Sequence, residues 1–288
     1  MFRIPDSWDR IDDEAIVSRS APPKAIVLGL GSAIGHHVAK RLKSDGWRVI
    51  GTARDKSRID SGVDQVICCH LDDKESIKQA EEELKPLSVD WSLLFVAAGT
   101  MKPIGKFFDL DASDWERGLQ ISALGPLRLL RAVWSTRSLA MNPTVCFLAG
   151  GGTNNDFPNY SAYCISKIML IKMMELLQSE EPTVRFVIVG PGYAKTPIHN
   201  ETILAGDAAG SNYERTKKLL EDSGTPLETI YRHVMSCHIG KVDEFGGRNF
   251  STVHDDWEDG SIIQVIQEFP DDAFRLRRFP YVSPKADS

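Results

Sequence analysis

The chain has 288 residues, of which 42% are hydrophobic and 26% charged, and its formal net charge is -6. This length and apolar content suffice for one sizeable core, so we expect a single domain with short extensions. An acidic balance without a basic stripe argues against nucleic-acid binding. No run approaches the roughly 18 apolar residues of a membrane helix, and the acidic start lacks the apolar core of a signal peptide. We therefore expect a cytoplasmic protein without nucleic-acid or membrane partners.

The five cysteines are an odd number and form no CxxC pair, and the seven histidines show no metal-binding spacing. Reduced, mostly buried thiols are typical of the cytoplasm. We predict no metal site.

Strands and helices are predicted to alternate along the chain. Runs rich in Ile and Val indicate strands, and apolar residues at helical spacing indicate helices. The predicted strands are 24–28, 47–52, 65–69, 91–97, 144–148 and 185–189, and the predicted helices are 36–44, 74–84, 113–136 and 160–177. This alternation is typical of an α/β protein with a Rossmann-type, doubly wound parallel sheet in three layers.

The domain is expected to span residues 24–254, after an N-terminal extension at 1–23. Residues 197–240 are mostly polar, and we interpret them as a substrate-covering insertion that holds helices but no sheet strands. A last strand is predicted within 246–254. Residues 255–288, with two late prolines, are interpreted as a C-terminal tail.

A glycine-rich turn follows the first predicted strand and opens into a helix. It contains Gly29, Gly31 and Gly35, together with Ser32 and Ile34. The pyrophosphate of a dinucleotide binds backbone N–H groups at a helix N-terminus, where small residues let it approach. Glycine turns also occur for purely steric reasons, but this position favours phosphate binding.

The end of the second predicted strand indicates which nicotinamide dinucleotide is bound. There an acid favours the free ribose hydroxyl of NAD, and a base favours the extra phosphate of NADP. Arg54 lies at this point and favours NADP, whereas Asp55 keeps NAD open as an alternative. Arg54 could also be a solvated loop charge.

Tyr163 and Lys167 form the candidate catalytic pair. They are four residues apart on a predicted helix and therefore share one face. A tyrosine can exchange a proton with a carbonyl oxygen near neutral pH only if a neighbouring cation lowers its pKa from about 10. Such a pair also arises by chance, but here it opens the helix that follows the fifth strand.

These features together resemble the short-chain dehydrogenase/reductase family over about Lys24–His199. Ala97-Ala98-Gly99 is similar to the family's NNAG segment, Tyr163 and Lys167 to its YxxxK pair, and Ala33 replaces one glycine of its TGxxxGxG motif. The resemblance implies an NAD(P)-dependent enzyme acting on a small molecule and a homodimer or homotetramer. It implies cofactor contacts from Gly29, Gly31, Ser32, Ile34, Gly35, Arg54, Ala98, Gly99, Tyr163, Lys167, Pro191, Gly192 and Thr196.

Two positions depart from the family pattern. Ser122 stands where the family usually has an asparagine, and we assign it a catalytic role in proton relay. The family's catalytic serine, about thirteen residues before the tyrosine, is replaced by the run Gly150–Thr153. Losing such a hydrogen-bond donor can cost on the order of 10²-fold in rate. Thr153, Ser161 or the N–H groups of the glycine run could substitute.

Substrate contacts are expected from Gly151, Thr153 and His199, although a loop histidine is more often simply exposed. The run from Gly150 to Tyr163 resembles a divergent branch found in bacterial surface-polysaccharide and unusual-sugar gene sets. The leading hypothesis is an oxidoreductase acting on a carbonyl or secondary alcohol, including that of a sugar or sugar nucleotide. The alternatives are a sugar epimerase or dehydratase that uses transient oxidation, and a dinucleotide-binding scaffold or sensor without turnover.

Overall fold

The computed structural model describes residues 21–59, 62–240, 242–257 and 260–278. Within these ranges one parallel sheet has the strand order β3-β2-β1-β4-β5-β6-β7. Its strands are β1 (Lys24–Leu28), β2 (Arg48–Ala53), β3 (Gln65–Cys68), β4 (Trp91–Val96), β5 (Thr144–Leu148), β6 (Arg185–Gly190) and β7 (Arg248–Ser251). The predicted strands, including the last one, are confirmed to within one or two residues at each end.

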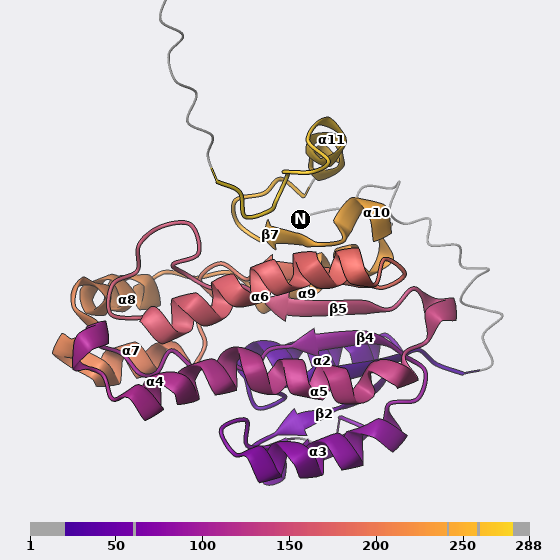
Figure 1. Cartoon of the computed structure of the whole chain (residues 1–288), viewed down its shortest axis with the longest axis horizontal. Helices are drawn as coiled ribbons and strands as arrows, with labels where there is room; N and C mark the ends of the chain where they lie inside the picture. Colours follow the sequence, from indigo (N-terminus) through magenta and orange to yellow (C-terminus); the bar gives the residue numbers. More distant parts are fainter. Residues whose placement is uncertain (1–20, 60–61, 241, 258–259, 279–288) are drawn as a thin grey trace, which may run out of the picture.

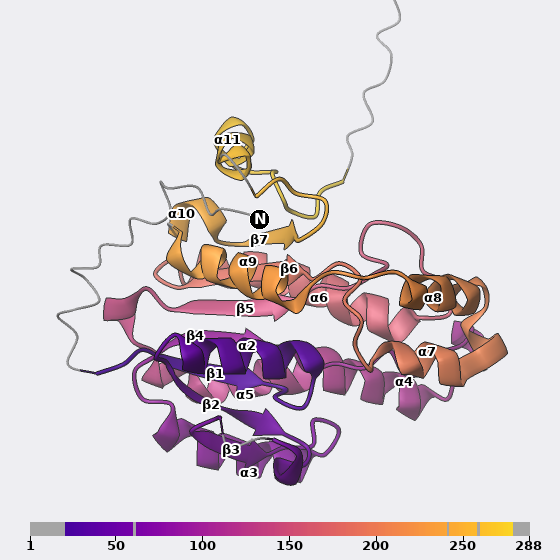
Figure 2. The same cartoon turned by 180° about the vertical axis from the view of Figure 1, so that it is seen from behind.

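Helices cover both faces of the sheet, which confirms the three-layer Rossmann-type architecture (Figures 1 and 2). One face carries α3 (Lys74–Leu87), α4 (Ala112–Leu119), α5 (Gly125–Val133) and α6 (Ser161–Glu180). The other face carries α2 (Ala33–Ser44) and α9 (Leu227–Ile239). Two buried clusters, one on each side of the sheet, form the core. The sheet is buried on both faces, as parallel sheets are.

The predicted helix 113–136 consists of α4 and α5 joined by a π-helical turn at Gln120–Leu124. The backbone stays in the right-handed helical region through the junction, so the two helices run on continuously. A π turn inserts extra backbone into a helix and is frequent at functional sites. Here it contains Ser122, which is buried.

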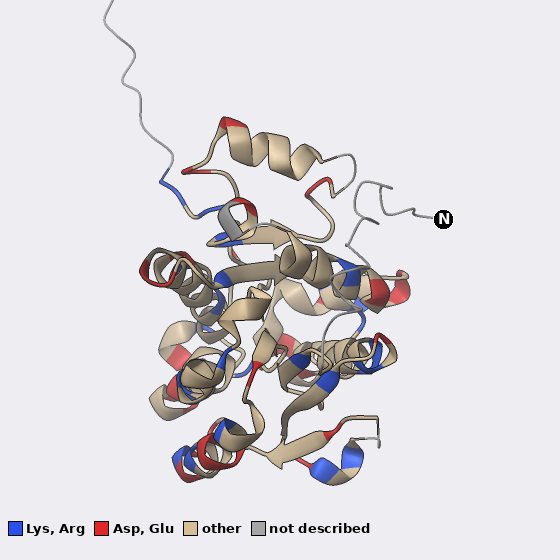
Figure 3. Ribbon diagram, turned by 90° about the vertical axis from the view of Figure 1, so that its right-hand side faces the viewer, with Lys and Arg blue, Asp and Glu red and all other residues tan. Residues whose placement is uncertain are grey.

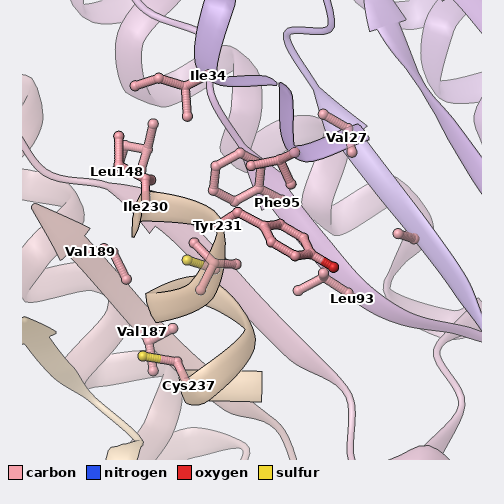
Figure 4. Packing of buried hydrophobic residues seen from close by; sticks show 14 of the residues in the cluster. Val27, Ile34, Leu93, Phe95, Leu148, Val187, Val189, Ile230, Tyr231 and Cys237 are labelled. Atoms are coloured by element: carbon pink, nitrogen blue, oxygen red, sulfur yellow. The ribbon is translucent and has the colours of Figure 1, made fainter. Parts of the chain in front are cut away.

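The predicted insertion at 197–240 is shorter than expected. Its first part, α7 (His199–Ala205) and α8 (Ser211–Glu221), lies beyond the carboxyl ends of the strands (Figures 1 and 2). Its last part is α9, a core helix: Ile230, Tyr231 and Cys237 pack against the sheet residues Val187 and Phe95 in one cluster (Figure 4). Apolar residues on one face suffice for a helix that covers a sheet, so the low apolar content of this stretch was misleading.

The segment predicted as a C-terminal tail also joins the core. It contains α11 (Ser261–Glu268), whose Ile262 and Ile266 are buried in the same cluster as Phe250 of β7. The buried Arg248 holds the chain beyond this helix by donating to the carbonyl oxygens of Ala273 and Pro270. Residues 1–20 and 279–288 lie outside the described residues, and so does almost all of the predicted N-terminal extension.

Charged residues are distributed over the flanking helices. In Figure 3, Lys and Arg alternate with Asp and Glu on the helices, while the strands between them are mostly uncharged. Among the described residues, no helix has both the length and the apolar character that crossing a membrane requires.

Candidate active site

A cavity of about 2140 Å³ opens at the carboxyl ends of the strands. Loops after β1, β2, β4, β5 and β6 line it, and α7 and α8 close one side. In open parallel sheets, ligands bind at this edge, where the strand order reverses. Here the reversal lies between β1 and β4.

The turn after β1 has the geometry of a phosphate cradle. Ser32 caps α2 by accepting a hydrogen bond from the N–H of Gly35 at 3.0 Å, and its hydroxyl donates to the Gly29 carbonyl at 2.9 Å. Gly29 has a φ of +97°, and a Cβ there would lie 2.6 Å from the nitrogen of Ala98. A Cβ at Gly35 would overlap the carbonyl oxygen of Gly29. Only glycines allow this close approach of the two loops, so these residues fit a dinucleotide.

The cavity brings together nearly all the predicted cofactor residues. Gly35 lies beneath the turn and does not line the cavity, whereas Gly31 does, with no atom within 4 Å of where its Cβ would lie. The lining residues predicted from the sequence are Gly29, Gly31, Ser32, Ile34, Arg54, Ala98, Gly99, Tyr163, Lys167, Pro191, Gly192 and Thr196.

At the end of β2, the two candidate side chains for cofactor choice differ in their partners. Asp55 accepts hydrogen bonds from the backbone and the hydroxyl of Ser57 and pairs with Arg58 at 3.1 Å. These hydrogen bonds lower the pKa of Asp55, the larger contributions coming from Ser57. Arg54 is exposed, lines the cavity, and forms no side-chain hydrogen bond or ion pair within the described ranges. Its guanidinium is therefore available to a ligand.

Tyr163 and Lys167 lie together in the cavity wall and are both almost fully buried, at 7% and 6% exposure. The Lys167 Nζ lies 5.7 Å from the centre of the tyrosine ring and donates to the Leu148 carbonyl at 2.9 Å. Burial lowers the pKa of Lys167 to about 8. The pKa of Tyr163 is raised, by burial first and then by the nearby Cys164 and Glu201. The lysine was expected to lower the pKa of Tyr163, but desolvation of the phenolate raises it.

The position of the missing serine is filled by the tyrosine itself. A Cβ at Gly150 would overlap the hydroxyl of Tyr163 and lie 2.6 Å from its Cζ. With Tyr163 in this place, position 150 has no room for any side chain. The glycine at position 150 therefore leaves the space that the Tyr163 hydroxyl occupies, where a serine side chain would collide with it.

Ser122 lies behind the wall of the cavity and does not line it. Its hydroxyl accepts from the N–H of Thr100 and donates to the Thr100 carbonyl, both at 3.2 Å. A Cβ at Gly99 would lie 3.8 Å from Ser122 Oγ and 3.9 Å from Lys167 Nζ. Ser122 thus supports the turn that faces Lys167, and its described hydrogen bonds reach neither Lys167 nor Tyr163.

The other substrate candidates differ in how they are placed. Gly151, Thr153 and His199 line the cavity, and the Thr153 hydroxyl donates to the Gly150 carbonyl at 3.3 Å. His199 bonds to the carbonyl of Ala194 and packs on the Tyr193 ring, and burial lowers its pKa. Ser161 accepts from the Trp115 indole at 3.0 Å and lies outside the cavity.

Sequence reasoning missed two residues of the site, Thr100 and Glu201. The Glu201 carboxylate accepts from the Thr100 hydroxyl at 2.9 and 3.1 Å and from the N–H of Met101 at 2.6 Å. These residues are about one hundred positions apart, so no local pattern could have joined them. Among the described residues, no cluster of His, Cys, Asp and Glu could hold a metal ion.

Residues 23–205 match the family described as short chain dehydrogenase. The match covers more than half of the chain and includes the glycine turn, Tyr163 and Lys167. The chain therefore belongs to the short-chain dehydrogenase family, an oxidoreductase family that uses NAD(P) cofactors.

Relatives of known activity are distant. The 3-ketodihydrosphingosine reductase of Bos taurus is 28% identical over 69% of this chain and 67% of its own length. The benzil reductase of Bacillus subtilis is 23% identical over 76% of this chain and 98% of its own length. The chain matches less than half (47%) of an uncharacterized oxidoreductase of Schizosaccharomyces pombe, at 29% identity. A crystal structure of NAD+-bound xylitol dehydrogenase shares the fold, with a TM-score of 0.69 at 19% identity over 81% of this chain and 98% of that one.

Proposed function

We propose that this protein is an NADP-dependent oxidoreductase that interconverts a carbonyl and a secondary alcohol, with Tyr163 as its acid/base. The observation that carries the proposal is the burial of Tyr163 and Lys167 in the same cavity as the glycine cradle. A proton donor, a cation and a phosphate site in one cavity match the needs of this reaction.

The residues of the chain divide the work between them. When bound, the cofactor supplies or accepts the hydride. The turn at Gly29–Gly35 would hold its phosphates, and Gly99, Pro191 and Thr196 line the same cavity as this turn and Tyr163. Tyr163 holds or takes the proton of the substrate oxygen at its hydroxyl. Lys167 would stabilise negative charge on the Tyr163 oxygen and would help to hold the ribose of a bound cofactor.

The preference for NADP rests on the loop after β2. Arg54 lines the cavity and has no side-chain partner within the part of the chain that the structure describes, while Asp55 is engaged by Ser57 and Arg58. A carboxylate held in this way is less available to a ribose hydroxyl, and a free guanidinium suits the extra phosphate of NADP.

The substrate is proposed to carry several hydroxyl groups, as a sugar or sugar nucleotide does. The support is the polar loop at the substrate end of the cavity, where Thr153, Asn154, Asn155 and Asp156 line the wall. Hydroxyl and amide groups of this kind bind polyols through hydrogen bonds.

A homodimer or homotetramer is proposed to form through α5 and α6. Ile165 and Leu176 of α6 are 47% and 48% exposed, and their spacing of three helical turns places them on one face. Leu124 at the start of α5 is 43% exposed. All five cysteines are free, in line with the proposed cytoplasmic location.

The test is a titration of the purified protein with NADPH and NADH, followed by cofactor consumption with a panel of keto-sugars and simple ketones. Tighter binding of NADPH and net consumption are expected. Binding without net consumption would instead support the epimerase or dehydratase alternative, or the sensor. A protein that binds neither cofactor contradicts the proposal.

A further inference from the structure

The helix that follows the site, α7, is tied to the catalytic machinery by two adjacent residues. Glu201 accepts hydrogen bonds from the Thr100 hydroxyl and the Met101 N–H, both in the turn after β4. Thr202, the next residue, accepts from the Tyr160 hydroxyl at 2.9 Å, one helical turn before Tyr163. Thus α7 bridges the β4 turn and the start of α6, the two segments that surround the reacting position.

The hydrogen-bond directions at Thr100 are determined by its neighbours. Its hydroxyl accepts from the N–H of Lys102 at 3.1 Å, and a carboxylate can only accept. The hydroxyl proton therefore goes to Glu201. Hydrogen bonds to an ionised acceptor are shorter and stronger than neutral ones, and the 2.6 Å bond from Met101 fits this pattern.

The turn at Gly99–Met101 is thus held from two sides. Ser122, in the π turn behind the cavity wall, bonds to the N–H and carbonyl of Thr100. From the opposite side, Glu201 accepts from the Thr100 hydroxyl; it belongs to the segment formed by α7 and α8, which we call the lid. Gly99, at the start of this turn, faces Lys167. The position of the wall beside Lys167 therefore depends on both contacts.

We propose that Glu201 is a positioning residue, whose carboxylate latches α7 onto the Thr100–Met101 turn and closes the substrate end of the site around Tyr163. This inference rests on the proposed function. Among the described residues, the titratable groups that face Tyr163 are the Lys167 ammonium and the Cys164 thiol on its own helix and the Glu201 carboxylate on α7. Because a carboxylate disfavours a nearby phenolate, Glu201 also helps to hold the proton on Tyr163.

The test compares Glu201→Gln with Glu214→Gln. Glutamine keeps the shape of the side chain and loses the charge. Glu214 lies on α8 in the same lid, and its carboxylate faces outward and pairs with Lys217, so its substitution controls for the loss of an acid from this segment. For Glu201→Gln, kcat/KM for the carbonyl should fall about tenfold. Cofactor affinity should change much less than kcat/KM, since Glu201 bonds to Thr100 and Met101 and not to the glycine turn after β1.

The pH profile separates a positioning role from a merely structural one. Removing the carboxylate favours the phenolate, so the decline of carbonyl reduction at high pH should move to lower pH in Glu201→Gln. Glu201→Asp, which keeps the charge, should restore the profile. Thr100→Val, which removes the hydroxyl that donates to Glu201, should weaken turnover, and its effect should not add fully to that of Glu201→Gln, because both changes act on the same hydrogen bond.

Equal kcat/KM and equal pH profiles in Glu201→Gln and Glu214→Gln overturn the proposal. If the wild-type protein binds cofactor but reduces no carbonyl, the proposed function fails. The rate of amide hydrogen exchange in α7 then tests separately whether Glu201 holds this helix on the Thr100–Met101 turn. Faster exchange in Glu201→Gln than in Glu214→Gln supports the latch. Equal exchange contradicts it.

Discussion

The two ends of the cavity are built in different ways. At the cofactor end, the shape comes from glycines, since Gly29 and Gly35 let neighbouring backbones approach where a Cβ would collide. At the substrate end, the shape comes from side chains far apart in the chain, such as Glu201 on Thr100 and Tyr160 on Thr202. The first end is specified by a short motif, and the second by tertiary contacts. The predictions below test whether the two ends can be altered separately.

Tyr163→Phe should have the largest effect on the substrate end while leaving the cofactor end intact. Removing the hydroxyl takes away the acid/base and should lower kcat by about 10²- to 10⁴-fold, while the glycine cradle continues to bind NADPH. Turnover and fluorescence titration measure the two effects. Tyr160→Phe is the matched comparison and should lower kcat much less, because it removes a hydroxyl one helical turn away whose bond, among the described residues, goes to Thr202. Equal losses in the two variants would contradict the assignment of Tyr163.

Lys167→Met tests how much the burial of the Lys167 ammonium, where the two ends of the cavity meet, lowers the stability of the folded chain. Burial lowers the pKa of Lys167 to about 8, against 10.5 for a free lysine. The unfolded chain therefore binds the proton of Lys167 more tightly than the folded chain does. The resulting loss of folding stability is fully present below pH about 8, and it decreases as the pH rises towards 10.5.

At neutral pH the Lys167→Met variant should therefore be more stable than the wild type, by up to roughly 3 kcal/mol. This advantage should narrow above pH about 8. Denaturant unfolding over a pH series measures it, with Lys172→Met, on the exposed side of the same helix, as the control for losing a lysine. If the difference in the free energy of unfolding between Lys167→Met and the wild type stays constant with pH, the prediction is wrong.

Restoring the family's serine by Gly150→Ser should damage the substrate end. The new Cβ would overlap the Tyr163 hydroxyl, and we expect a loss of about 1–3 kcal/mol in the free energy of unfolding together with lower kcat. Gly151→Ser is the control for stability, since a Cβ there meets only the Phe157 ring, at 3.9 Å. Higher kcat at unchanged stability would mean that Tyr163 has another position that the serine favours.

The smallest effect is expected at the far cofactor end. Arg54→Ala should weaken NADPH binding about tenfold and leave NADH binding unchanged, because only NADP carries the phosphate that the guanidinium contacts. Lys56→Ala, which removes a nearby cation paired with Glu83, is the control. Competitive titration measures the ratio of the affinities for NADPH and NADH in each variant. An equal loss for both cofactors would show that Arg54 does not read the phosphate.

The success of the sequence predictions follows the same division. The strands, the glycine turn and the pairing of Tyr163 with Lys167 depend on local patterns, and the structure places them together as expected. Glu201 was missed because its partners lie about a hundred residues away. The segment containing α9 does not stand out in the sequence, because polar residues alternate with its buried residues, and a helix that covers a sheet needs apolar residues on one face only. The overlap of position 150 with Tyr163 depends on side-chain packing, which no motif contains.

The strand order also has a consequence for synthesis on the ribosome. From β5 to β7, each strand lies directly beside the one made just before it, so these strands can join the sheet in the order in which they are translated. Until the next strand emerges, the newest one is an open edge able to pair with other chains. The last edge is formed by β7, and Phe250 of that strand packs in the same buried cluster as Ile262 and Ile266 of α11. A ribosome that stalls before α11 therefore leaves a nascent chain with an unfinished, aggregation-prone border.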